Sequence, residues 1–233
     1  MSEQRNDEIN FGSVITDISR GIQLTAGQLE RCLTDEDTGY RYLALADIKN
    51  GFSFELDTEN LRFFDPKQLG KSVEQFCVKP DMILLTKNDT PFKVDIAGKI
   101  DDKKIIVGGN IYMIKVDESK VIPRWLCYWL QSAEGMAKLR GASSFTHNGK
   151  MKWISIKQIE GLMIPHIDFN QQANELVAKI YEYMDWLKRL SNDFFRNSNE
   201  IFAIFHSLGM PTPIEDLEAD FAKPTSFLSE NED

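Results

Sequence analysis

The sequence has few cysteines and no long apolar run, and both shortages narrow what the protein can be. Only three cysteines occur in 233 residues, at Cys32, Cys77 and Cys127. They form no CxxC pair and no matching histidine spacing, so a zinc site is not predicted and unpaired thiols are expected. No apolar stretch reaches the ~18 residues that a membrane-spanning helix needs.

The N-terminal residues lack the apolar core of a signal peptide, because MSEQRNDEINFG is almost entirely polar. An odd number of widely spaced cysteines also fits a reducing compartment. We therefore expect a cytoplasmic protein with no membrane partner.

Enzyme signatures are absent as well. The sequence contains no GxGxxG, no GxxxxGK[ST], no HExxH and no nucleophile elbow. The three histidines, His147, His166 and His206, share no helical face. We therefore expect no catalytic residues, no metal and no cofactor.

Negative charge is abundant but unevenly placed. The net charge is -9, and residues 214–233 hold seven acids against one base, Lys223. Residues 210–233 are therefore expected to form an acidic, disordered tail. The rest of the chain carries only a small negative charge, so one of its faces could still be basic enough to bind phosphate.

One window inside this acidic protein has no acid. From 135 to 159 there are five bases and no carboxylate. Its central stretch, GASSFTHNGKMKWISIK, adds hydroxyl, amide and aromatic groups. Lysine and arginine neutralise phosphates, and hydroxyl or amide groups can bond phosphates or base edges. Composition alone leaves two interpretations open, a solvated loop or a nucleic-acid contact. The polar loop at 86–93 has the same two interpretations.

The order of apolar patterns predicts an α+β fold. Strands are expected at 40–48, in MILLT from Met82, and on both sides of Gly108–Gly109, where a bulge or close backbone approach is predicted. The segment from Val14 to Gly21 has short helical periodicity, and 123–141 has the pattern of one helix. Trp153 opens a strand and is expected in the core.

A long helical pattern closes the folded part of the chain. Asp168 or Asn170 is its expected N-cap, and Gly209 ends it. Its apolar residues recur at spacings of three and four, at Leu176, Ile180, Tyr183, Leu187, Leu190 and Phe194. This spacing favours pairing with another long helix in an antiparallel coiled coil, although a core helix folded back on its own domain stays open.

Several segments, taken in order, resemble one known family. The segments are FGSVITDISRGIQL, YRYLALADIKNG, VKPDMILLTKNDTPFKVDIAG, NIYMIKVDESKVIPRWLCYWLQSAEG, GASSFTHNGKMKWISIKQIEGLMIP and IDFNQQANELVAKI. This series, over residues 11–190, is similar to the DNA-specificity (S) subunit of type I restriction-modification systems. It resembles one target-recognition domain with its following helix.

The resemblance implies a fold and a set of partners. It implies a recognition domain with a mixed twisted sheet at 1–168, a dimerisation helix at 169–209 and the tail at 210–233. Such domains are non-catalytic, read half of a bipartite site in double-stranded DNA, and dock methyltransferase subunits and in some systems a restriction subunit. Since this chain holds one such unit, a second copy in a homodimer would supply the other half.

The resemblance also assigns DNA contacts to the two polar loops. The residues implied are Lys87, Asn88, Lys93, Arg140, Ser143, Ser144, Thr146, His147, Asn148, Lys150 and Lys152. The alternative function is a regulatory or decoy module that binds the methyltransferase, which the acidic tail favours.

Overall fold

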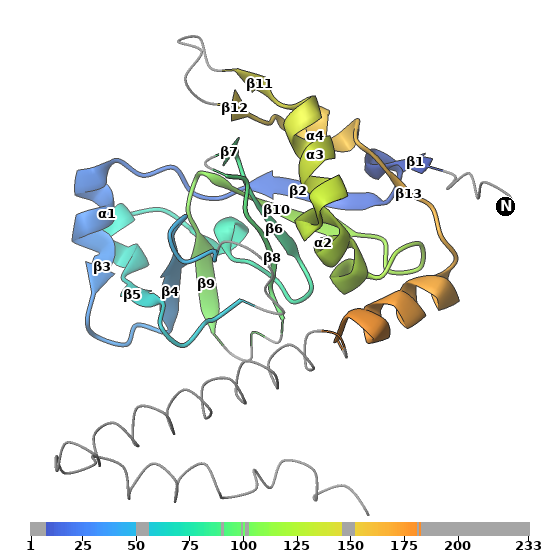
Figure 1. The fold of residues 1–233 in the computed structure, drawn as a ribbon. Helices are drawn as coiled ribbons and strands as arrows, with labels where there is room; N and C mark the ends of the chain where they lie inside the picture. Colours follow the sequence, from blue (N-terminus) through green and yellow to red (C-terminus); the bar gives the residue numbers. More distant parts are fainter. Residues whose placement is uncertain are drawn as a thin grey trace, which may run out of the picture. The chain divides into compact units, whose positions relative to one another are not determined.

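The fold comes from a computed structural model, which describes residues 8–49, 56–89, 91–98, 100, 103–145, 152–180 and 182. The chain divides into two units, Met1–Val177 and Ala178–Asp233. The labelled elements belong to the first unit and form several small sheets with helices packed on them (Figure 1).

A four-stranded antiparallel sheet lies at the centre of this unit. Its order is β2 (Ile15–Arg20), β10 (Ile111–Val116), β6 (Ile83–Thr86) and β8 (Val94–Ile96). The strand predicted in MILLT is β6, and the two predicted around the glycine pair are β9 (Lys104–Val107) and β10. These predictions are confirmed.

Strand β6 is buried on both faces. Its side chains alternate between two cores, with Ile83 and Leu85 in one and Leu84 in the other. Strand β10 also contributes to both cores, with Tyr112 and Ile114 in the first and Met113 in the second. Neighbouring residues of a strand point to opposite faces, so a strand covered on both sides needs a continuous apolar run.

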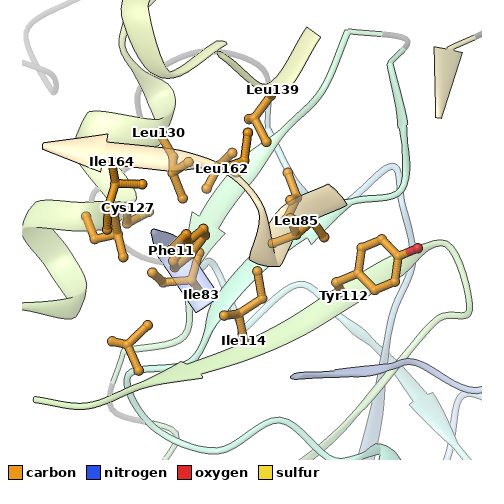
Figure 2. Close-up of a cluster of buried hydrophobic side chains, with 14 of the residues drawn as sticks. Phe11, Ile83, Leu85, Tyr112, Ile114, Cys127, Leu130, Leu139, Leu162 and Ile164 are labelled. Carbon is orange, nitrogen blue, oxygen red and sulfur yellow. The ribbon is translucent and has the colours of Figure 1, made fainter. Parts of the chain in front are cut away.

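The first core lies between the central sheet and two helices, α2 (Pro123–Gln131) and α3 (Ala133–Ala142). The antiparallel pair β1 (Glu8–Asn10) and β13 (Met163–Pro165) also lines it, as does the short helix η1 (Phe11–Ser13). Figure 2 shows Phe11 among the side chains of this core. Phe11 is fully buried, because segments from both ends of the unit cover it.

The prediction of one helix over 123–141 is wrong. Ser132 has extended backbone angles and separates α2 from α3. Its hydroxyl accepts a hydrogen bond from the Gly135 amide at 3.2 Å and so caps α3. A serine side chain that bonds nearby backbone groups competes with helix continuation, which explains the break.

A second sheet packs on the other face of the central one. Its order is β3 (Leu33–Thr34), β5 (Arg62–Phe64), β4 (Tyr40–Leu43) and β9, and the β4–β9 pair is parallel. The predicted strand from Tyr40 is therefore confirmed, but it ends at Leu43 instead of continuing to residue 48. A second core fills the space between the two sheets, and a third lies under α1 (Ala26–Cys32). Two short helices, η2 (Pro66–Leu69) and η3 (Glu74–Phe76), complete this side.

Backbone segments approach each other closely at Gly21, Gly108 and Gly109, as the glycine pair predicted. A side-chain carbon placed on Gly21 would lie 2.3 Å from the carbonyl oxygens of Val107 and Gly108. The Ile22 amide donates to the Val107 carbonyl at 2.7 Å. The expected helix over 14–21 is wrong, because residues 15–20 form β2. Strand pairing with β10 overrides a local spacing that suits a helix.

The α+β class is confirmed, but the strands divide among several sheets, and of the sheets in the described residues only β3–β5–β4–β9 is mixed. After α4 (Ile156–Glu160) and β13, residues 169–180 are helical. Asp168 is the N-cap, since its carboxylate accepts from the Gln171 amide at 2.7 Å. The pairing predicted for the remainder of this helix lies outside the described residues.

Candidate nucleic-acid interface

The two polar loops that the sequence singled out meet in one small sheet. Its strands are β11 (Ser144–Phe145), β12 (Lys152–Trp153) and β7 (Asn88–Asp89), in that order. Lys152 lies opposite both Phe145 and Asp89. Figure 1 shows this sheet beside α3. Segments far apart in the sequence therefore form one surface.

Hydrogen bonds attach this sheet to the body of the protein. The Ile154 amide donates to the Lys87 carbonyl at 3.0 Å, and the Tyr112 hydroxyl donates to the Ile154 carbonyl at 2.9 Å. Ile154 is fully buried. The position of β12 is thus set by the central sheet, through β10 and the residue that follows β6.

Two hydroxyl groups of the predicted site are used within the protein. Ser143 donates to the Arg140 carbonyl at 2.8 Å, where α3 ends. Ser144 accepts a hydrogen bond from the Gln158 side chain at 2.8 Å. Gln158 also completes the capping box of α4 with Ser155. The Gln158–Ser144 bond holds the start of β11 against α4, and the Ser143–Arg140 bond closes the end of α3.

Two lysines of the site lie against aromatic rings. The Lys87 ammonium is 5.4 Å from the centroid of the Trp153 ring, and the Lys152 ammonium is 5.1 Å from that of Phe145. Lys152 also donates to the Arg140 carbonyl at 3.0 Å. Trp153 is half-buried beside Lys87 and is absent from the described core clusters, where it was expected.

Arg20, at the end of β2, adds a cation that the sequence did not indicate. Its guanidinium donates to the Gly109 carbonyl and, at 3.4 Å, to the Asn110 side chain. The Lys87 amide donates to the Asn110 carbonyl at 2.8 Å, so both cations border one turn. Burial, followed by the charge of Arg20, lowers the pKa of Lys87. Only long-range strand pairing places Arg20 here, so no local sequence signal could have identified it.

Lys93 takes a different position from the other predicted cations. Its ammonium donates to the carbonyls of Leu45 at 3.3 Å and Ile48 at 2.6 Å. Its amide donates to the Thr86 hydroxyl at 2.9 Å. The Lys93 side chain thus links the 45–48 turn to the β6–β8 hairpin. It does not lie on the small sheet.

The remaining predicted contacts at Thr146, His147, Asn148 and Lys150 lie outside the described residues. Of the predicted dimerisation residues, the structure describes Leu176 and Ile180. Both are half-buried on a helix where Val177 is 48% exposed. The others, Tyr183, Leu187, Leu190 and Phe194, also lie outside the described residues.

The chemistry of the small sheet suits a polyanion. Lys87, Lys152 and Arg20 lie on or beside it, and Arg140 ends the adjoining helix. In the described part of the chain, no group of three or more His, Cys, Asp or Glu side chains could hold a metal ion. None of the described helices has the length and apolar character needed to cross a membrane.

Comparisons with known proteins were made on sequence and on structure. No protein-family model matches the sequence, and no curated protein matches it. The HsdS subunit from Thermoanaerobacter tengcongensis superposes with a TM-score of 0.52 at 16% identity, covering 81% of this chain and 41% of the other. A chain from a study of type I restriction-modification complex assembly superposes with a TM-score of 0.54, also at 16% identity, covering 89% and 45%.

The chain thus spans less than half the length of the two solved chains it matches. At this identity the likeness concerns the fold, and it agrees with the resemblance carried by the ordered segments of the sequence. The protein has the fold of part of an S subunit of a type I restriction-modification system.

Proposed function

We propose that this protein is a DNA-recognition subunit of a restriction-modification system, without catalytic activity of its own. It would read one half of a bipartite site through the small sheet and dock methyltransferase subunits. The observation that carries the proposal is the convergence of β7, β11 and β12. Two loops selected from the sequence for their polar, basic character are paired there strand to strand.

The structure supports this assignment in a second way. Lys87 follows β6, whose four residues are all buried, and Arg20 ends β2 of the same sheet. Cations held on rigid strands need little reordering when they meet a phosphate backbone. Within the three-stranded sheet, β11 and β12 form an antiparallel pair at one edge. A two-stranded antiparallel ribbon fits the major groove of B-DNA, where base edges can be read.

The first test is the salt dependence of DNA binding, measured by fluorescence anisotropy with randomised duplexes between about 50 and 200 mM salt. The wild-type protein should show a linear fall of log affinity with log salt. Lys87→Gln and Arg140→Gln should each reduce the slope by about 0.9 for every phosphate that the replaced side chain neutralises. Lys67→Gln, which removes the same charge within η2, should leave the slope unchanged.

Absence of salt-sensitive binding, alone or with the cognate methyltransferase, would refute DNA recognition by this chain. Equal slopes for Lys67→Gln and Lys87→Gln would refute the small sheet as the contact. Docking is tested separately, by co-purification of the full chain with methyltransferase subunits. A decoy would retain this docking while lacking DNA binding.

We also propose that two copies pair through residues 169–209, so that two recognition units face a palindromic bipartite site. Half-exposed apolar residues on the described part of this helix, Leu176 and Ile180, support the pairing. Light scattering of the full chain should give the mass of a dimer. A monomer at micromolar concentration, with and without DNA, would refute the homodimer.

A further inference from the structure

Phe145 has an unusual position for an aromatic side chain. Among the large apolar side chains that the structure describes, it is the most exposed, at 64%. It ends β11 at the outer edge of the small sheet. Removing a phenylalanine side chain from water is favourable, so this exposed ring retains most of its capacity to drive contact with a partner.

The surroundings of the ring limit which part of it can make that contact. The Lys152 ammonium lies over one ring face, 5.1 Å from the centroid. A hydrogen bond of 3.0 Å to the Arg140 carbonyl holds that ammonium at the end of α3. An aromatic side chain that inserts between base pairs stacks on them with both faces of its ring, and here Lys152 occupies one face. The exposed edge therefore remains for contact.

The chemistry of DNA supplies a matching apolar group. In the major groove, thymine is distinguished by its C5-methyl group, which apolar side chains including phenylalanine contact. The cation beside the ring makes approach to the negatively charged groove favourable, which would not hold for an isolated apolar patch. The exposed Phe145 ring could therefore contact the thymine methyl group on the floor of the groove, while Lys152 lies close to the flanking phosphates.

We propose that Phe145 is a specificity-determining residue that recognises the C5-methyl group of a thymine in the target site. This inference rests on the proposed function and deepens it. Removing one buried methyl group costs on the order of 0.8 kcal/mol or somewhat more. Affinity should therefore change about four- to tenfold when the methyl group is removed.

The test is a selection from randomised duplexes, followed by affinity measurements in which single thymines of the selected site are replaced by uracil. Uracil lacks only the methyl group. With wild-type protein, one replacement should weaken binding about four- to tenfold. With Phe145→Ala, that same replacement should have no effect, while Phe145→Leu should retain part of it.

Phe63→Ala is the matched control, because Arg41 lies over the Phe63 ring at 4.7 Å but on a different sheet. It should preserve the full response to uracil. If Phe145→Ala keeps the wild-type response at every position, the inference is overturned. It is also overturned if Phe145→Ala and Phe145→Leu both lower the melting temperature and abolish all binding, since the ring is then structural.

Salt-sensitive binding separates this inference from the proposed function. If wild-type protein binds duplexes with a salt-dependent affinity but no single uracil weakens it, only the role of Phe145 fails. If wild-type protein does not bind DNA at all, the proposed function fails and the role of Phe145 fails with it.

Discussion

Gln172 joins the start of the C-terminal helix to the body of the protein, and its removal gives a sharp test. The side chain is only 2% exposed. Its oxygen accepts from the Ile122 amide at 2.9 Å, at the residue that precedes α2, and its nitrogen donates to the Ile167 carbonyl at 3.0 Å. One side chain therefore satisfies two backbone groups in different segments.

The expected magnitude follows from these two bonds. Each hydrogen bond contributes about 1 kcal/mol, and each buried group left without a partner costs roughly 1–3 kcal/mol. We expect Gln172→Ala to lower the free energy of unfolding by about 2–4 kcal/mol in total. For a protein of this size, the melting temperature should fall by roughly 5–15 °C.

Calorimetry and hydrogen exchange give the readouts. Gln171→Ala is the control, because Gln171 is exposed and its side-chain nitrogen donates to the carboxylate of Glu175, which is also exposed. Its effect should stay within about 0.5 kcal/mol. Gln172→Met fills the space without hydrogen bonding and should destabilise nearly as much as the alanine variant. The Ile122 amide should lose exchange protection in both Gln172 variants.

A structural role for the two Gln172 hydrogen bonds is refuted if Gln172→Ala and Gln171→Ala melt within about 1 °C of each other. A loss of about 1 kcal/mol would shift the melting temperature by clearly more than that. It is refuted equally if Gln172→Met is as stable as wild type, because packing would then account for the loss of stability in the alanine variant.

Two further predictions concern the sheets. Gly21→Ala should prevent folding, since the added carbon would lie 2.3 Å from two carbonyl oxygens. Gly27→Ala is the control: Gly27 lies in α1 with open space around it, so alanine should stabilise the protein by about 0.5–1 kcal/mol in thermal melts. Burial, and less strongly the charge of Glu74, raises the pKa of the Cys77 thiol from 9.0 to about 11. Stability should therefore be lost as pH rises through this range, and Cys77→Ser should reduce that loss in denaturant titrations. Because Cys77 is only half-buried, its alkylation at pH 8 should be slower in the folded protein than in the unfolded one.

Strands buried on both faces were the part of the fold easiest to predict. In β6, and in β9 and β10 on either side of Gly108, the side chains that point into a core are apolar. Segments with one covered face were harder. Val14, Ile15 and Ile18 have the spacing of a helix, and pairing with β10 overrides it. At Ser132 a single cap outweighs the helical pattern on either side.

The candidate site was predictable by composition but not by geometry. The absence of acids singled out the window that contains Arg140 and Lys152, and the polar loop pointed to Lys87. Nothing local showed that β12 would pair with β7, that Arg20 would border the same turn, or that Lys93 would bond the 45–48 turn. These contacts depend on strand pairing between distant segments, which no short pattern records.

The attachment of the small sheet has a consequence for how such a protein can diversify. Lys87 directly follows a strand buried on both faces, so its place is fixed by the cores. Strands β11 and β12 are two residues long and contribute little to those cores. Replacements among their outward-facing residues can therefore accumulate with small effects on folding. Under the proposed function, exchange of β11 and β12 would change the target preference, while the body that positions them remains unchanged.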